Sequence, residues 1–173
     1  GGLLMEIVTR PQPREERRAE KAAKKERGIA AVVLAAGRST RMGAINKMIA
    51  KIGGKPLVRI AAEQALASHA SPVIVVTGHE RAKVGAALDG LPVRLVHNPD
   101  FAEGLGTSLK TGIAAVPQDA DGAIVCLGDM PLISADLIDR LIEAFAPDRG
   151  NLIAVPVSDG RRGNPVLWSR RFF

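Results

Sequence analysis

The segment IAAVVLAAGRSTRMGAINK, residues 29–47, decides how the rest of this chain can fold. Residues 29–34 are an unbroken apolar run with two β-branched valines, which is typical of a strand buried on both faces of a parallel sheet. The loop that follows carries little side-chain bulk, so a ligand can lie against its backbone N–H groups. Arg38, Arg41 and Lys47 add positive charge there. The segment therefore predicts a site for a polyphosphate.

An ordinary surface loop is the alternative interpretation of these residues, because glycine loops after strands are common and cations on loops are usually solvated. The segment matches neither the Walker A pattern nor the Rossmann fingerprint. No glycine-lysine-serine or glycine-lysine-threonine run follows it, and no second and third glycine stand at the Rossmann spacing. Motifs elsewhere in the chain are needed to distinguish an ordinary surface loop from a phosphate-binding site.

The composition favours one α/β domain with an aliphatic core. The chain has 173 residues, enough for a well-packed domain, and 46% of them are hydrophobic while only 3% are aromatic. So few aromatics disfavour a protein that stacks nucleic-acid bases. The net charge of +6 is shared evenly between residues 1–28 and 29–173, so neither part is strongly basic. We expect neither a nucleic acid nor a membrane as a partner.

The cysteine and histidine residues predict neither a metal site nor a set of disulfide bonds. Cys126 is the only cysteine and lies in an apolar run, so we interpret it as an inert core residue. The histidines at positions 69, 79 and 97 have no partner at metal-ligand spacing. The chain shows no signal-like start and no apolar run of about 20 residues, and we therefore expect a cytoplasmic protein.

Residues 1–28 change character twice, from an apolar start through a proline-broken stretch to a charged helical run. We interpret them as a linker or as the tail of a possible upstream fused domain. A basic arm that binds a partner is the less favoured alternative. Residues 29–173 are then the globular domain.

Strand and helix patterns alternate after the loop. This alternation predicts a doubly wound, mostly parallel sheet with helices on both faces, a Rossmann-like α/β fold. The expected strands are residues 29–34, 72–77, 91–96, 122–127 and 151–157, with a further extended piece at residues 163–167. The expected helices are residues 56–68, 80–88 and 134–145, with another that ends near residue 116.

Asp129 follows the expected strand at residues 122–127. Ligands of open α/β sheets bind at the carboxyl ends of the strands, and a carboxylate there suits Mg²⁺ held jointly with phosphate oxygens. The alternative is that Asp129 only caps the turn before the next helix. Thr107 and Ser108 present a similar choice, since they are either helix caps or groups that point with Asn98 into a cleft.

The chain carries several motifs in a fixed order: LAAG at residues 34–37, SxRMG at 39–43, NK at 46–47, GGKPL at 53–57 and GDMP at 128–131. In this order they closely resemble the molybdenum cofactor cytidylyltransferase family of molybdopterin nucleotidyltransferases. The resemblance covers residues 29–173, but a late G-D motif of the family is missing. It implies a nucleotidyltransferase domain that is truncated at its C-terminus.

The resemblance implies transfer of a nucleotidyl group from a nucleoside triphosphate to the phosphate of molybdopterin, with Mg²⁺ as cofactor. Ala35, Ala36 and Asn46 favour CTP over GTP. It marks Arg41, Lys47 and Asp129 as catalytic, with Asp129 also the metal ligand. It marks Leu34, Ala35, Ala36, Gly37, Arg38, Ser39, Lys47 and Thr77 as nucleotide-binding, and Asn98, Ser108 and Asn164 as substrate-binding.

Asn164 departs from the family, which usually has histidine there in G-H-P-V. Two alternatives stay open. One is a non-catalytic nucleotide-binding or pterin-binding module of a larger protein, and the other is a cytidylyltransferase for another phosphorylated acceptor.

Overall fold

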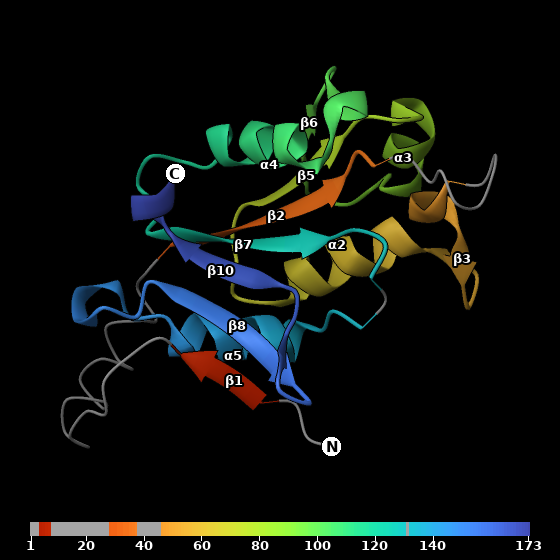
Figure 1. Ribbon diagram of the computed structural model, residues 1–173. Coiled ribbons are helices and arrows are strands. Elements are labelled where there is room, and N and C mark those ends of the chain that lie inside the picture. The colour runs from red at the N-terminus through yellow and green to blue at the C-terminus, as the bar shows by residue number, and fades with distance from the viewer. Residues whose placement is uncertain (1–3, 8–27, 38–45, 131) are drawn as a thin grey trace.

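The computed structural model describes residues 4–7, 28–37, 46–130 and 132–173 (Figure 1). The predicted site residues Arg38, Ser39 and Arg41 lie outside this part of the chain, as does Pro131. The described residues form an eight-stranded sheet with helices on both faces and a separate two-stranded hairpin. The predicted fold class is confirmed.

The sheet runs in the order β1-β8-β10-β7-β2-β5-β6, and β9 pairs with β8. β2 (Ile29–Ala35) is central and lies parallel to both β7 (Gly122–Leu127) and β5 (Val73–Thr77), and β6 (Arg94–His97) extends the parallel part. β10 (Val166–Ser169) is antiparallel to β7 and to β8 (Ile153–Ser158), so β8 again points the same way as β7. β1 (Leu4–Ile7) and β9 (Arg161–Arg162) are antiparallel to β8.

All seven residues of β2 are buried, which explains why its sequence is continuously apolar rather than alternating. Ala31, Val33 and Ala35 face one core, while Val32 and Leu34 face the other. A strand with water on one face would alternate polar and apolar residues. The apolar run at residues 29–34 is therefore explained by the helices that cover both faces of the sheet.

Helices cover the two faces unequally (Figure 1). α2 (Leu57–Ala67), α3 (Arg81–Ala87) and α5 (Ala135–Ala144) pack in the core on the side of Val33. α4 (Leu105–Ala114) packs on the other face, against β2, β5 and β6. Its Gly112 lies so close to the sheet that a Cβ there would come within 2.4 Å of Val32 Cγ1. The short 3-10 helix η4 (Arg170–Phe172) contacts β10.

Element boundaries differ from the sequence expectation in physically understandable ways. The third expected strand, residues 91–96, begins only at Arg94, and α2 begins at Leu57 because Pro56 pairs in the β3 (Lys51–Ile52) and β4 (Lys55–Pro56) hairpin. Gly53 and Gly54 form the hairpin turn with φ of 58° and 82°, the positive values that a two-residue hairpin requires.

Strand β1 was not predicted, because residues 1–28 were interpreted as a linker or tail. Its backbone pairs with β8 from Leu4 opposite Val157 to Ile7 opposite Ala154. The division into residues 1–28 and 29–173 stays a prediction. No helix in the described ranges is both long and apolar enough to cross a membrane.

Candidate active site

The carboxyl ends of β2, β5 and β7 meet at one edge of the sheet, and glycines let their backbones approach closely. A Cβ on Gly78, just after β5, would lie 2.8 Å from Ala36 Cβ and 2.6 Å from Phe101 Cβ. A Cβ on Gly128, just after β7, would lie 3.0 Å from the carbonyl oxygen of Leu34. Hydrogen bonds fix the same approach, from His79 N to Ala36 O at 3.3 Å and from Gly128 N to Leu34 O at 2.9 Å.

This packing leaves the backbone of Gly37 where a ligand can reach it. Leu34, Ala35 and Ala36 are buried and Gly37 is exposed. A strand end held by backbone contacts on both sides and made of small residues suits close approach by an oxyanion. The assignment of these residues to nucleotide binding stays a prediction.

Lys47 lies beside the same edge. It is the first residue of the short 3-10 helix η1 (Lys47–Ile49), which Asn46 caps by accepting a hydrogen bond from Met48 N at 3.0 Å. Met48 is buried, and a Cβ on Gly128 would lie 3.1 Å from its sulfur. The contact between Met48 and Gly128 therefore holds Lys47 near the turn that carries Asp129.

Asn46 is buried, and its amide oxygen accepts the cap hydrogen bond from Met48 N, while its side chain also interacts with the Glu80 carboxylate and helps to lower the pKa of that group. The role of Asn46 in base choice stays a prediction.

Asp129 is half-buried in the turn after β7, where Met130 N donates to Leu127 O. Within residues 4–7, 28–37, 46–130 and 132–173, no three His, Cys, Asp or Glu side chains are placed to hold a metal together. A lone carboxylate still fits Mg²⁺, because this ion usually takes one or two carboxylates and completes its shell with phosphate oxygens and water. Asp129 therefore suits a metal that arrives with a nucleotide.

Thr77, Asn98 and Ser108 are buried polar residues at this edge. Asn98 N donates to Thr77 O at 2.7 Å, and the Thr77 hydroxyl lies 3.3 Å from His97 Nδ1. The Asn98 amide nitrogen donates to Thr107 Oγ1 and Ser108 Oγ at 2.9 Å each, and its oxygen accepts from Asp100 N at 2.9 Å.

The hydrogen bonds of Asn98 hold the segment from Asp100 to Ser108 in one conformation. The N-cap of α4 is Gly104, so neither Thr107 nor Ser108 caps this helix directly. Ser108 is buried and Thr107 is half-buried, and both accept hydrogen bonds from Asn98 that brace the segment. The predicted substrate-binding roles of Asn98 and Ser108 stay predictions.

His79 and Glu80 follow Gly78 and were not predicted as site residues. Glu80 has a positive φ of 50°, which is uncommon for a residue with a side chain. Its carboxylate lies 2.7 Å from Lys83 Nζ and 3.4 Å from His79 Nε2. The hydrogen bond from Lys83 is the main reason that the pKa of Glu80 is lowered. In the sequence, the glycine at position 78 was the only signal close to His79 and Glu80.

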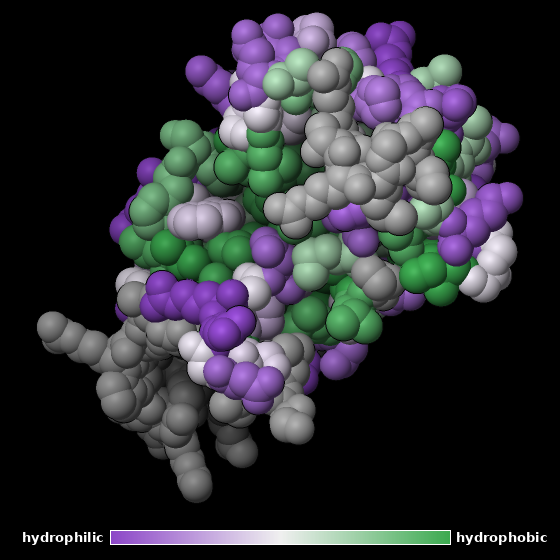
Figure 2. Space-filling view, turned by 45° about the vertical axis from the view of Figure 1, so that its right-hand side comes forward, coloured by the Kyte–Doolittle hydropathy of each residue, from purple (hydrophilic) through white to green (hydrophobic). Residues whose placement is uncertain are grey.

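Asn164 is exposed and lines a pocket of about 320 Å³ between α4 and the ends of β2, β7 and β10. The other lining side chains are mainly apolar, including Leu34, Leu105, Leu109, Leu127, Val166 and Trp168. Apolar side chains gather at the surface in Figure 2 between more hydrophilic areas. The leucines of α4 and the lone tryptophan carried no signal that separated them from core residues in the sequence.

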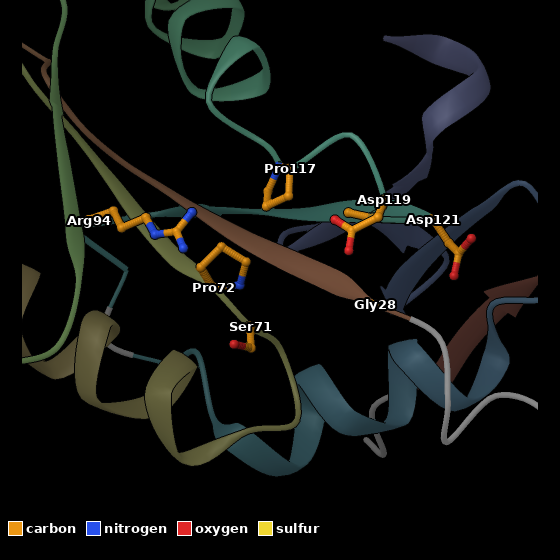
Figure 3. Close-up of a pocket in the computed structure, with 8 residues that line it drawn as sticks. Gly28, Ser71, Pro72, Arg94, Pro117, Asp119 and Asp121 are labelled. Atoms are coloured by element: carbon orange, nitrogen blue, oxygen red, sulfur yellow. The ribbon is translucent and has the colours of Figure 1, made fainter.

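A second hollow, of about 500 Å³, lies at the opposite edge of the sheet. In Figure 3, Arg94 at the start of β6 and Asp119 after α4 point toward it, and Gly28 and Pro72 lie at the amino ends of their strands. None of the predicted site residues lines it. Ligands of open α/β sheets bind at the carboxyl edge, so the candidate active site is the first edge.

The sheet is parallel from β7 through β2 and β5 to β6, and its carboxyl edge carries a small-residue loop, Lys47 and Asp129, an arrangement that suits an α/β nucleotidyltransferase domain. The chain belongs to the family of MobA-like NTP transferase domains, whose model matches residues 31–173.

Solved structures of similar fold agree with this family. A nucleotidyl transferase from Methanothermobacter matches with a TM-score of 0.74 and 26% identity, over 84% of this chain and 73% of that one. A Mycobacterium tuberculosis protein, Rv0371c in complex with manganese, matches with a TM-score of 0.63 and 26% identity, over 83% of this chain and 72% of that one.

Curated relatives include bifunctional protein GlmU from Kineococcus radiotolerans, which is 37% identical over 129 residues, 73% of this chain and 26% of that protein. The chain spans between 25% and 31% of the GlmU proteins that match first. Nicotine blue oxidoreductase from Paenarthrobacter nicotinovorans is 32% identical over 143 residues, 80% of this chain and 70% of that protein.

Proposed function

We propose that this chain transfers a nucleotidyl group from a nucleoside triphosphate, CTP in preference to GTP, to the phosphate of a molybdopterin-type acceptor and releases pyrophosphate. The observation that carries this proposal is the convergence of strand ends at the carboxyl edge. There Gly128 contacts both Leu34 of β2 and Met48, the neighbour of Lys47. This close packing supports a site in which backbone amides after β2, Lys47 and Asp129 act together.

The chemistry requires positioning and charge neutralisation more than proton transfer. Backbone amides after β2, with Arg38, Arg41 and Lys47, hold the triphosphate, and Asp129 holds its divalent ion. When bound, Mg²⁺ neutralises the negative charge on the phosphate oxygens. A phosphate nucleophile is already ionised near neutral pH, so the acceptor needs no general base. The manganese complex of Rv0371c supports the use of a divalent ion.

The preference for CTP rests on Ala35, Ala36 and Asn46. The choice of a molybdopterin-type acceptor is based on the motif resemblance alone. The names of the curated relatives, GlmU and nicotine blue oxidoreductase, do not mention molybdopterin. Calorimetric titration with CTP and with GTP, each in Mg²⁺, tests the nucleotide. Tighter binding of CTP is the expected result. Equal or tighter binding of GTP would overturn the base assignment and leave nucleotidyl transfer standing, whereas no binding of either would overturn the proposal.

A measurement of catalytic turnover distinguishes the proposed enzyme from a non-catalytic binding module. The test is pyrophosphate release from CTP in the presence of molybdopterin. Release that depends on both substrates is expected. Nucleotide binding without any release would favour the binding module.

A second candidate function is oxidation or reduction of nicotine blue, because nicotine blue oxidoreductase shares 32% identity over most of this chain. The observation that favours it is the apolar pocket lined by Trp168 beside the candidate loop. Loss of nicotine blue absorbance with a reduced nicotinamide dinucleotide as electron donor would support it. An unchanged spectrum would exclude it.

A further inference from the structure

Glu80, the residue just before α3, has a backbone conformation that its local structure does not explain. Its φ of 50° and ψ of 45° lie in the left-handed region, which is unfavourable for a residue with a Cβ atom. A residue at this N-cap position normally has an extended backbone and caps the helix with its side chain. Glu80 has neither property, since its side chain makes no capping hydrogen bond within the described helix α3.

Asp159 is the only other residue with a side chain and a positive φ in the described parts of the chain, at 52°. It precedes Gly160, with a φ of 74°, in the two-residue loop between β8 and β9. Asp-Gly is a preferred pair in such hairpin loops, which require positive φ at both positions. Turn chemistry therefore accounts for Asp159, whereas Glu80 opens a helix. A strained residue there persists because surrounding contacts hold it.

Three side chains from different segments hold the Glu80 carboxylate. Lys83 Nζ lies 2.7 Å and His79 Nε2 lies 3.4 Å from its oxygens. The Asn46 side chain interacts with the same carboxylate, and its amide NH₂ is the donor that it can offer. The Glu80 side chain is only 21% exposed and Asn46 is 3% exposed. The contact between them therefore lies inside the protein rather than on its surface.

This carboxylate joins two segments that border the candidate nucleotide edge. One is the turn after β5, where His79 N donates to Ala36 O at 3.3 Å. The other is η1, where Asn46 Oδ1 accepts from Met48 N at 3.0 Å. The elements α3 and η1 also contact each other directly. Because Lys47 is the first residue of η1, the same link fixes the position of its main chain.

We infer that Glu80 is a positioning residue whose carboxylate holds η1 against the turn after β5, and that the left-handed backbone at position 80 directs the carboxylate there. The inference rests on the proposed nucleotidyl transfer. It deepens that proposal by adding a residue that acts on the nucleotide through the main chain of Lys47. Glu80 does this without contact to either substrate.

Glu80→Gly separates this role from a purely structural one. Glycine adopts a left-handed backbone without strain, and the ion pair with Lys83, whose side chain is 67% exposed, is worth little. Relief of strain offsets the lost contacts, so the melting temperature should be kept. The dissociation constant of CTP in Mg²⁺ should nevertheless rise about tenfold, the effect of a misplaced binding group. Wild-type affinity, or a fall in affinity matched by a fall in melting temperature, would overturn the inference.

Two further variants are matched controls. Asp159→Gly makes a similar exchange at the other left-handed position, in a loop after β8, which β10, β7 and β2 separate from β5 in the sheet. It should bind CTP as the wild type does. Glu80→Gln keeps an acceptor oxygen within reach of Asn46 and should recover most of the affinity lost in Glu80→Gly. Equal weakening in Asp159→Gly, or no recovery in Glu80→Gln, would contradict the positioning role.

Hydrogen exchange in the free 173-residue chain makes the test independent of the nucleotide. The Met48 amide, which donates to Asn46, should exchange about five- to tenfold faster in Glu80→Gly, the scale of one hydrogen bond's net contribution. Unchanged exchange would refute the inference, while CTP binding by the wild type would keep the proposed function. Faster exchange in a protein whose wild type binds neither CTP nor GTP would refute nucleotidyl transfer and keep the positioning of η1.

Discussion

Gly78→Ala tests whether close backbone approach builds the nucleotide site. The added Cβ would lie 2.6 Å from Phe101 Cβ and 2.8 Å from Ala36 Cβ, which is 0.8 Å and 0.6 Å short of the 3.4 Å at which ordinary contact begins. Gly78 is not among the glycines with positive φ, so the cost comes from this overlap and not from backbone strain. Both neighbouring Cβ atoms are fixed to the main chain, so the backbone must move.

Overpacking of this kind costs about 1–3 kcal/mol of unfolding free energy. Movement of Ala36 also displaces the loop after β2, so CTP affinity in Mg²⁺ should fall by about tenfold or more, the effect of a misplaced binding group. Urea denaturation measures the first effect and calorimetry the second. Gly85→Ala in α3 is the control, because its Cβ would meet only Leu95 Cδ1 at 3.9 Å. Wild-type stability and affinity in Gly78→Ala would refute the reasoning.

Lys47→Ala should weaken nucleotide binding by about 1.5–3 kcal/mol, as for a lost hydrogen bond to a charged group, with thermal stability unchanged; equal affinity by calorimetry would make Lys47 a solvated surface residue. Asp129→Asn should abolish the Mg²⁺ dependence of nucleotide binding while metal-free binding is kept, and its stability should change by about 1 kcal/mol or less; a full magnesium response would remove the metal role. The pKa of Glu63 is lowered from 4.5, mainly by the hydrogen bond from Lys55, so its contribution to stability is present above 4.5 and lost as the pH falls through the folded value. Denaturation of Glu63→Gln should therefore show a deficit near neutral pH that disappears in acid; the same deficit at both pH values would contradict the ion pair.

Local sequence patterns predicted the parallel half of the sheet well. The apolar runs at residues 29–34 and 122–127 became β2 and β7, because full burial by two helical layers leaves a direct mark on composition. The antiparallel half was harder to predict. Strand direction at β10 and the pairing of β1 with β8 depend on partners distant in the chain, which no local periodicity encodes.

The site residues show the same division. Asp129 and Lys47 were recognisable from motifs, and the structure places both at the carboxyl edge. Their chemical roles, with those of Thr77 and Asn164, stay predictions. The need for glycine at position 78 arises from Phe101, a residue 23 positions later, so only the three-dimensional structure reveals it.

The buried amide of Asn98 has a consequence for how binding specificity can change. Its three hydrogen bonds fix the segment before α4 in the free protein, so little conformational entropy remains to be lost when a ligand arrives. The exposed positions carried by this segment and the first turns of α4, among them Leu105 and Leu109, are not needed for its shape. Substitutions there can accumulate without unfolding the edge of the sheet, which gives this scaffold a surface on which new acceptors can be selected during evolution.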